Sequence, residues 1–71
     1  MSIIFTSHAK DRMNERGISR EQIEECIRYP EKVFMESEKI RHFQKSFFND
    51  TLEVVAEFKN RHYIIITVFV L

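Results

Sequence analysis

The hydrophobic pattern changes its period once along the chain, near residue 30. Ile3–Phe5 is a short apolar run that predicts a first strand. Ile23, Cys26 and Ile27 then recur at helical spacing, whereas β-branched and aromatic residues dominate from residue 31 onward. We therefore expect one domain over residues 1–71, with a strand and helical hairpin in 1–30 and an antiparallel sheet in 31–71.

Capping residues mark the ends of two predicted helices before residue 31. Thr6, or the serine after it, can begin the first helix, and Gly17 ends it by supplying a left-handed residue. Ser19 begins the second helix, because Gln22 lies where a capping box needs it. Pro30 ends that helix.

Turn residues divide the β-rich half into four consecutive antiparallel strands. They lie at 36–39, at 49–50 and at 59–61. The predicted fold class is therefore α+β, with a short N-terminal strand and a two-helix hairpin packed on a four-stranded antiparallel sheet.

The sequence patterns of two strands in this sheet predict that their faces differ in exposure to solvent. The strand over 51–58 alternates, so that its apolar residues form one core face; they are Leu52, Val54, Ala56 and Phe58. Tyr63–Leu71 is apolar on both faces apart from Thr67. This pattern predicts a central strand, or one whose outer face is covered by a helix or another subunit.

The composition favours a small intracellular domain without a cofactor. One cysteine excludes an internal disulfide framework, and no His or Cys spacing or Gly-rich loop predicts a metal or nucleotide site. We expect a cytoplasmic location with Cys26 reduced and buried, since no signal peptide is visible and 64–71 is too short to span a bilayer. A domain this small buries only about 60% of its unfolded surface, so we expect a homodimer or a hetero-complex.

The net charge of zero hides a segregated distribution. Residues 1–20 carry four basic and two acidic side chains, 21–38 carry two basic and six acidic ones, and 39–71 carry five basic and three acidic ones. Such a domain can hold a local anion site despite its neutrality.

Three potential cations, His8, Arg12 and Arg16, line up along the first predicted helix, one turn apart. They repel one another, and they border the buried stripe of the helix. A phosphate is the functional candidate for their partner, because Arg offers a planar fork and His transfers protons near neutral pH. The structural alternative is pairing with sheet carboxylates such as Glu53 or Glu57.

A second basic group alternates with aromatic residues in the strand that begins at residue 40. Arg41, Phe43, Lys45 and Phe47 share one face, as in a platform for single-stranded nucleic acid. The alternative is that both rings belong to the core and the basic side chains lie over them. His42 falls on the opposite face and is predicted to be a plain surface or strand-edge histidine.

The N-terminal half carries a distinctive motif, His-x3-Arg-x3-Arg-Gly-Ile-Ser, over 8–19, followed by Tyr29-Pro30-Glu31-Lys32-Val33. With the late Ile66-Thr67-Val68, this sequence resembles the prokaryotic family catalogued as domain of unknown function 4258. The organisation is also similar to toxins of the BrnT and RelE type, small ribonucleases that an antitoxin inhibits. Those toxins commonly carry polar functional residues near the C-terminus, whereas this chain ends Val68-Phe69-Val70-Leu71.

The resemblance implies a toxin-type, metal-independent endoribonuclease or RNA-binding domain of a toxin–antitoxin system, with RNA and a cognate antitoxin as partners. It implies His8, Arg12 and Arg16 as catalytic residues and Arg41 and Lys45 as phosphate-binding residues. The alternative is a non-catalytic protein-interaction module or a structural homodimer of the same fold.

Overall fold

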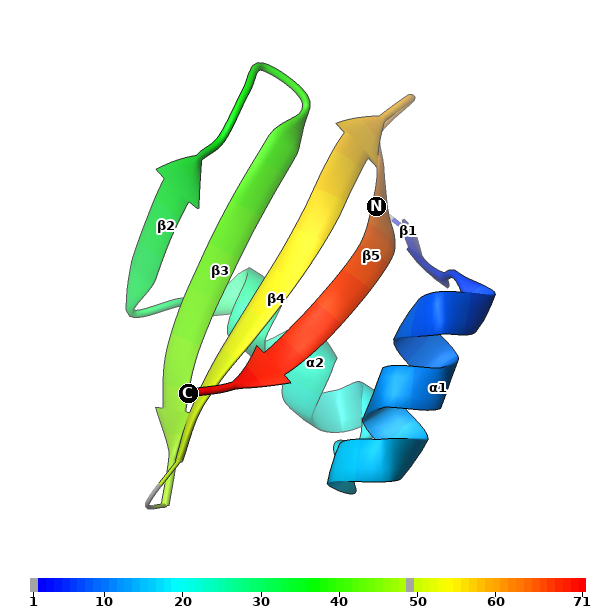
Figure 1. Cartoon of the computed structure of the whole chain (residues 1–71). Helices are drawn as coiled ribbons and strands as arrows, with labels where there is room; N and C mark the ends of the chain where they lie inside the picture. Colours follow the sequence, from blue (N-terminus) through cyan, green and yellow to red (C-terminus); the bar gives the residue numbers. More distant parts are fainter. Residues whose placement is uncertain (1, 49) are drawn as a thin grey trace.

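Over residues 2–48 and 50–71, the computed structural model contains two helices and five strands. Their bounds are β1 (Ser2–Phe5), α1 (Ser7–Arg16), α2 (Arg20–Arg28), β2 (Lys32–Met35), β3 (Ile40–Phe47), β4 (Asp50–Lys59) and β5 (His62–Val70). The order agrees with the one that the hydrophobic pattern predicts (Figure 1).

Short-range capping positions both helices. Thr6 is the N-cap of α1 and accepts a hydrogen bond from the Ala9 amide at 3.1 Å, and Gly17 ends the helix with a φ of 67°. Ser19 begins α2 with a complete capping box, in which its hydroxyl and the Gln22 side chain each accept the other residue's backbone amide. These predicted helix ends are therefore confirmed.

The five strands form one sheet in the order β1-β5-β4-β3-β2. Neighbours from β2 to β5 pair antiparallel, whereas β1 pairs parallel to β5 with Ser2 opposite His62 and Phe5 opposite Ile65. The predicted α+β class is confirmed, and the N-terminal strand extends the four-stranded antiparallel part into a five-stranded mixed sheet. By doing so, β1 pairs backbone groups on the outer edge of β5 over residues 62–65.

The central position of β5 explains its apolar sequence. It lies between β4 and β1, as one of the two predicted alternatives requires. The connection from β4 is a tight turn in which Asn60 and Arg61 have φ values of 52° and 64°, which suits a type I′ hairpin. The turn predicted at 49–50 includes Asn49, which lies outside the described residues.

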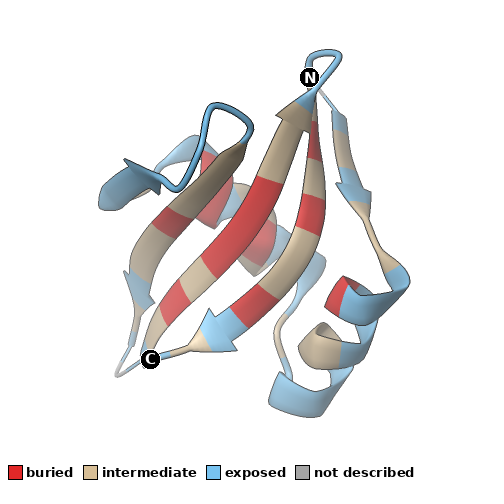
Figure 2. Ribbon diagram, turned by 45° about the horizontal axis from the view of Figure 1, so that its top comes forward, coloured by how far each residue is buried: buried red, intermediate tan, exposed pale blue. Residues whose placement is uncertain are grey.

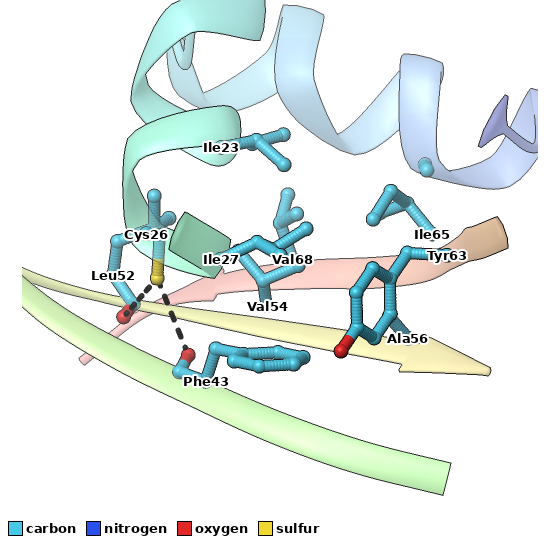
Figure 3. Close-up of a cluster of buried hydrophobic side chains, with 11 residues drawn as sticks. Ile23, Cys26, Ile27, Phe43, Leu52, Val54, Ala56, Tyr63, Ile65 and Val68 are labelled. Carbon is cyan, nitrogen blue, oxygen red and sulfur yellow. Dashed lines mark hydrogen bonds between the residues drawn. The ribbon is translucent and has the colours of Figure 1, made fainter. Parts of the chain in front are cut away.

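Both helices pack on one face of the sheet, and the core lies between these two layers (Figure 1). Buried residues recur along the central strands, mostly at alternate positions, with Val55 of β4 also buried between Val54 and Ala56 (Figure 2). The core cluster, most of which Figure 3 labels, consists of Ala9, Ile23, Cys26, Ile27, Phe43, Leu52, Val54, Ala56, Tyr63, Ile65 and Val68. Neither helix of the described residues is long and apolar enough to cross a membrane.

The opposite face of the sheet is not covered by a helix (Figure 1). Cross-strand register places His42, Gln44, Glu53 and Val55 on this uncovered face. Toward the β1 margin it carries Phe69, which is exposed. The alternation predicted for 51–58 is confirmed, since Leu52, Val54 and Ala56 face the helices and are buried.

Candidate nucleic-acid interface

Helix α1 presents His8, Arg12 and Arg16 along one line at its surface. His8 and Arg16 are exposed, and the Arg12 side chain is 40% exposed. Ala9 beside them is buried, and Met13 packs against the core. The line therefore borders the buried face of α1, as its helical spacing predicts.

Among residues 2–48 and 50–71, the ion pair on this line joins Arg12 to Glu15 of the same helix, with nitrogen and oxygen 3.4 Å apart. The proposed alternative partners, Glu53 and Glu57, lie on the uncovered face of the sheet, away from the helices. An exposed pair within one helix contributes only about 0.3–0.5 kcal/mol. The cations of α1 therefore stay accessible to an anion from solution.

Arg41 lies on the helix-facing side of β3, where the fold itself uses its guanidinium. Its Nη1 donates to the Tyr63 hydroxyl at 3.0 Å, and its Cζ lies 4.7 Å from the centre of the Phe58 ring. The Nε atom is buried and has no partner within the described residues. Arg41 is thus held by two aromatic side chains, and its contacts bring it to neither His8 nor Arg12.

Lys45 and its neighbours on the same strand face, Phe43 and Phe47, also make contacts within the fold. Its Nζ donates to the Tyr29 carbonyl oxygen at 2.9 Å, just past the end of α2. Phe43 is only 4% exposed and meets the Tyr63 ring edge-on, and Phe47 packs against the core. The rings of this strand face are therefore core residues, which is the alternative that the sequence left open.

His42 forms a polar cluster on the uncovered face that sequence reasoning missed. Its Nε2 lies 2.9 Å from a Glu36 oxygen and its Nδ1 lies 3.0 Å from a Glu53 oxygen. Gln44 donates to the other Glu53 oxygen at 2.6 Å, and the Phe34 ring stacks on the imidazole with centroids 4.9 Å apart. The register of the β3–β4 hairpin places Gln44 opposite Glu53. Pairing the two strands from their turn would therefore have brought Glu53 close to Gln44 and His42.

The two carboxylates favour the charged form of the imidazole. The hydrogen bond with Glu53 raises the pKa of His42 above its ordinary 6.5, burial opposes that rise, and the hydrogen bond with Glu36 adds to it. Burial alone would raise the pKa of Glu53, but hydrogen bonds from Gln44 and His42 outweigh burial and lower that pKa below 4.5. Protonated His42 then donates from both ring nitrogens.

A hollow of about 150 Å³ opens beside Arg16, at the end of α1. Its sides come from the α1–α2 connection, from the ends of β3 and β5 and from the start of β4. Its apolar side chains are those of Ile18, Phe47, Phe48, Leu52 and Val70. Its polar side chains are those of Arg16, Gln22 and Asp50. Sequence reasoning did not find this hollow, because its sides come from segments far apart in the chain.

Cys26 is buried in the core, as its apolar helix stripe predicts. Its thiol contacts the Phe43 carbonyl oxygen at 3.5 Å (Figure 3). Burial raises the pKa of Cys26 to about 12, so the thiolate is suppressed at neutral pH. Within the described residues, no group of three His, Cys, Asp or Glu side chains is arranged so that it could hold a metal ion.

Comparison with known proteins identifies the family of the chain. No curated protein and no solved structure matches it. The family described as Domain of unknown function (DUF4258) matches residues 5–70, a range that begins in β1 and includes both helices and the other four strands. The chain therefore belongs to this domain family of unknown function.

Proposed function

We propose that this chain is a toxin-type domain that acts in the cytoplasm, where it binds single-stranded RNA through α1 and cleaves it without a metal ion. The observation that supports binding is the line of His8, Arg12 and Arg16 at the surface of α1. The line is about 12 Å long at 1.5 Å per residue, enough to contact more than one phosphate of a strand.

The chemistry proposed for cleavage uses the RNA itself as nucleophile. The ribose 2′-hydroxyl attacks the adjacent phosphorus, and the bond from phosphorus to the 5′-oxygen breaks. His8 accepts the hydroxyl proton, water protonates the departing oxygen, and Arg12 stabilises the charge on the phosphorane. In this scheme Arg41 and Lys45 contribute less to phosphate binding than the arginines of α1. Arg41 already donates to the Tyr63 hydroxyl, and Lys45 donates to the Tyr29 carbonyl oxygen.

A binding series tests the proposed surface. Fluorescence anisotropy with a labelled single-stranded RNA, measured over a range of salt concentrations, should give affinity that falls with salt at about 0.7 logarithmic units per phosphate contact. Arg12→Ala and Arg16→Ala should each weaken binding and flatten that slope by about 0.7. Arg28→Ala is the matched control, because Arg28 is an exposed arginine in the last turn of the other helix.

Incubation of the same RNA with a chelator present tests cleavage. The wild-type chain should cleave it, and His8→Ala should bind it but leave it intact. Salt-sensitive binding without cleavage by the wild type would contradict the ribonuclease part of the proposal. Absence of salt-sensitive binding would contradict the whole proposal.

A second candidate function, interaction with a protein partner such as an antitoxin, is favoured by strand β2. This strand lies at the edge of the sheet, and all four of its residues are exposed. Val33, Phe34 and Met35 are 50%, 46% and 56% exposed. An apolar edge strand of this kind offers unpaired backbone groups to an added strand.

A further inference from the structure

The hollow beside Arg16 and the line of His8, Arg12 and Arg16 on α1 form one continuous surface. Arg16 is the last residue of α1 and also lines the hollow. Its apolar lining includes Ile18, Leu52 and Val70, whereas Asp50 and Gln22 supply hydrogen-bonding groups. A ligand whose phosphate binds His8, Arg12 or Arg16 therefore also reaches this hollow, which is mainly apolar but carries a few polar groups.

Phe48 stands at the rim of this hollow in an unusual conformation. It is fully exposed, and its φ is 56°, in the left-handed region that a bulky L-residue rarely adopts. Burial does not explain the aromatic side chain at this point, and the backbone conformation makes it costly. A ring held in solvent beside an apolar recess offers a face on which a flat ligand stacks.

We propose that the hollow binds one unstacked nucleobase of the RNA, with Phe48 stacking on the base and Arg16 contacting the adjoining phosphate. This inference rests on the proposed RNA binding and adds a base site to it. Three observations support a base. The volume of about 150 Å³ suits a single aromatic ring, Arg16 supplies charge that complements phosphate, and Phe48 supplies an exposed aromatic face.

The chain contains no tryptophan, so Phe48→Trp places a single fluorescent reporter at the rim. We compare a pentamer of uridylate with a pentamer of abasic ribose phosphates, which has the same charge but no bases. Only the uridylate should quench the fluorescence of the Phe48→Trp variant by stacking, and it should bind the wild type about fivefold or more tightly than the abasic strand. Phe48→Ala should abolish that difference, whereas Phe69→Ala and Phe69→Trp, changed on the uncovered face, serve as matched controls.

The outcomes separate the base site from the proposed function. Equal, salt-sensitive binding of both strands overturns the base site and leaves RNA binding by α1 intact. Absence of binding to either strand overturns both. Quenching of the Phe48→Trp variant by a capped phenylalanine amide, with no quenching by uridylate, assigns the hollow to a side chain of a protein partner and also overturns the base site.

Discussion

His42 lies between two carboxylates on the sheet face that no helix covers, and its hydrogen bonds tie the β2–β3 turn to β4. Glu36 comes from that turn and Glu53 from β4, so one imidazole joins a turn to a strand of the sheet. The pKa of His42 is raised and that of Glu53 is lowered. The two shifts have opposite consequences for stability as the pH changes.

We predict that the contribution of His42 to stability is complete below pH 6.5 and is lost as the pH rises through its raised folded pKa. The contribution of Glu53 is present above pH 4.5 and is lost as the pH falls through its lowered pKa. His42→Gln should therefore lower the free energy of unfolding on the order of 1 kcal/mol near pH 6, and less at pH 9. Urea unfolding at both pH values measures this, with His8→Gln on exposed α1 as control. An equal loss at both pH values would contradict the prediction.

The residues that the sequence predicted well are those that act through near neighbours. Gly17 and Ser19 end and begin helices through backbone conformation and contacts within three residues. The partners of His42 and Arg41 depend on strand register and on tertiary packing, which local pattern does not define. For the same reason, the helical spacing of His8, Arg12 and Arg16 was predictable, whereas the hollow beside Arg16 was not.

At the level of elements, the junction between β1 and α1 links the edge of the sheet to the first helix. The Thr6 hydroxyl accepts a hydrogen bond from the Ala9 amide and donates one to the Ile65 carbonyl oxygen at 2.7 Å. One side chain thus caps α1 and attaches it to β5. The parallel pairing of β1 was not predicted, because a four-residue strand carries no pattern that selects its partner.

We predict that Thr6→Ala lowers the free energy of unfolding by about 1–2 kcal/mol, because the variant loses both the helix cap and the bond to β5. Ser7→Ala is the matched control, since Ser7 is the neighbouring hydroxyl residue, is exposed, and lies inside the helix rather than at the N-cap. It should change stability by less than about 0.5 kcal/mol. Chemical denaturation of both variants measures the difference. Similar losses in the two variants would show that the cap at Thr6 is not the cause.

At the level of the whole molecule, the sheet has one covered and one uncovered face and ends at an apolar edge strand, β2. The edge at the other end, β1, is also short. Natural sheets limit association at their edges with charge or short strands; β2 is four residues long and carries one charge, Lys32, beside three exposed apolar side chains. Association through β2 is therefore the quaternary contact that we expect.

We predict a melting temperature that rises with protein concentration, since association stabilises the folded chain by mass action. Val33→Lys should remove this dependence while leaving the melting temperature at low concentration nearly unchanged, because Val33 is half exposed. Calorimetry over a wide concentration range measures both effects, and Lys39→Ala in the exposed β2–β3 turn is the control. A wild-type melting temperature independent of concentration would rule out self-association through β2.

The pairing of β1 with β5 has a consequence during synthesis on the ribosome. Residues 2–5 emerge before their partners, residues 62–65, which lie on the far side of both helices and three other strands in the chain. Until then β1 has no strand to pair with, and α1 has no β5 to pack against. A nascent chain interrupted before residue 62 therefore leaves apolar helix and strand surfaces exposed, which makes it a substrate for chaperones and proteases rather than a partly folded domain.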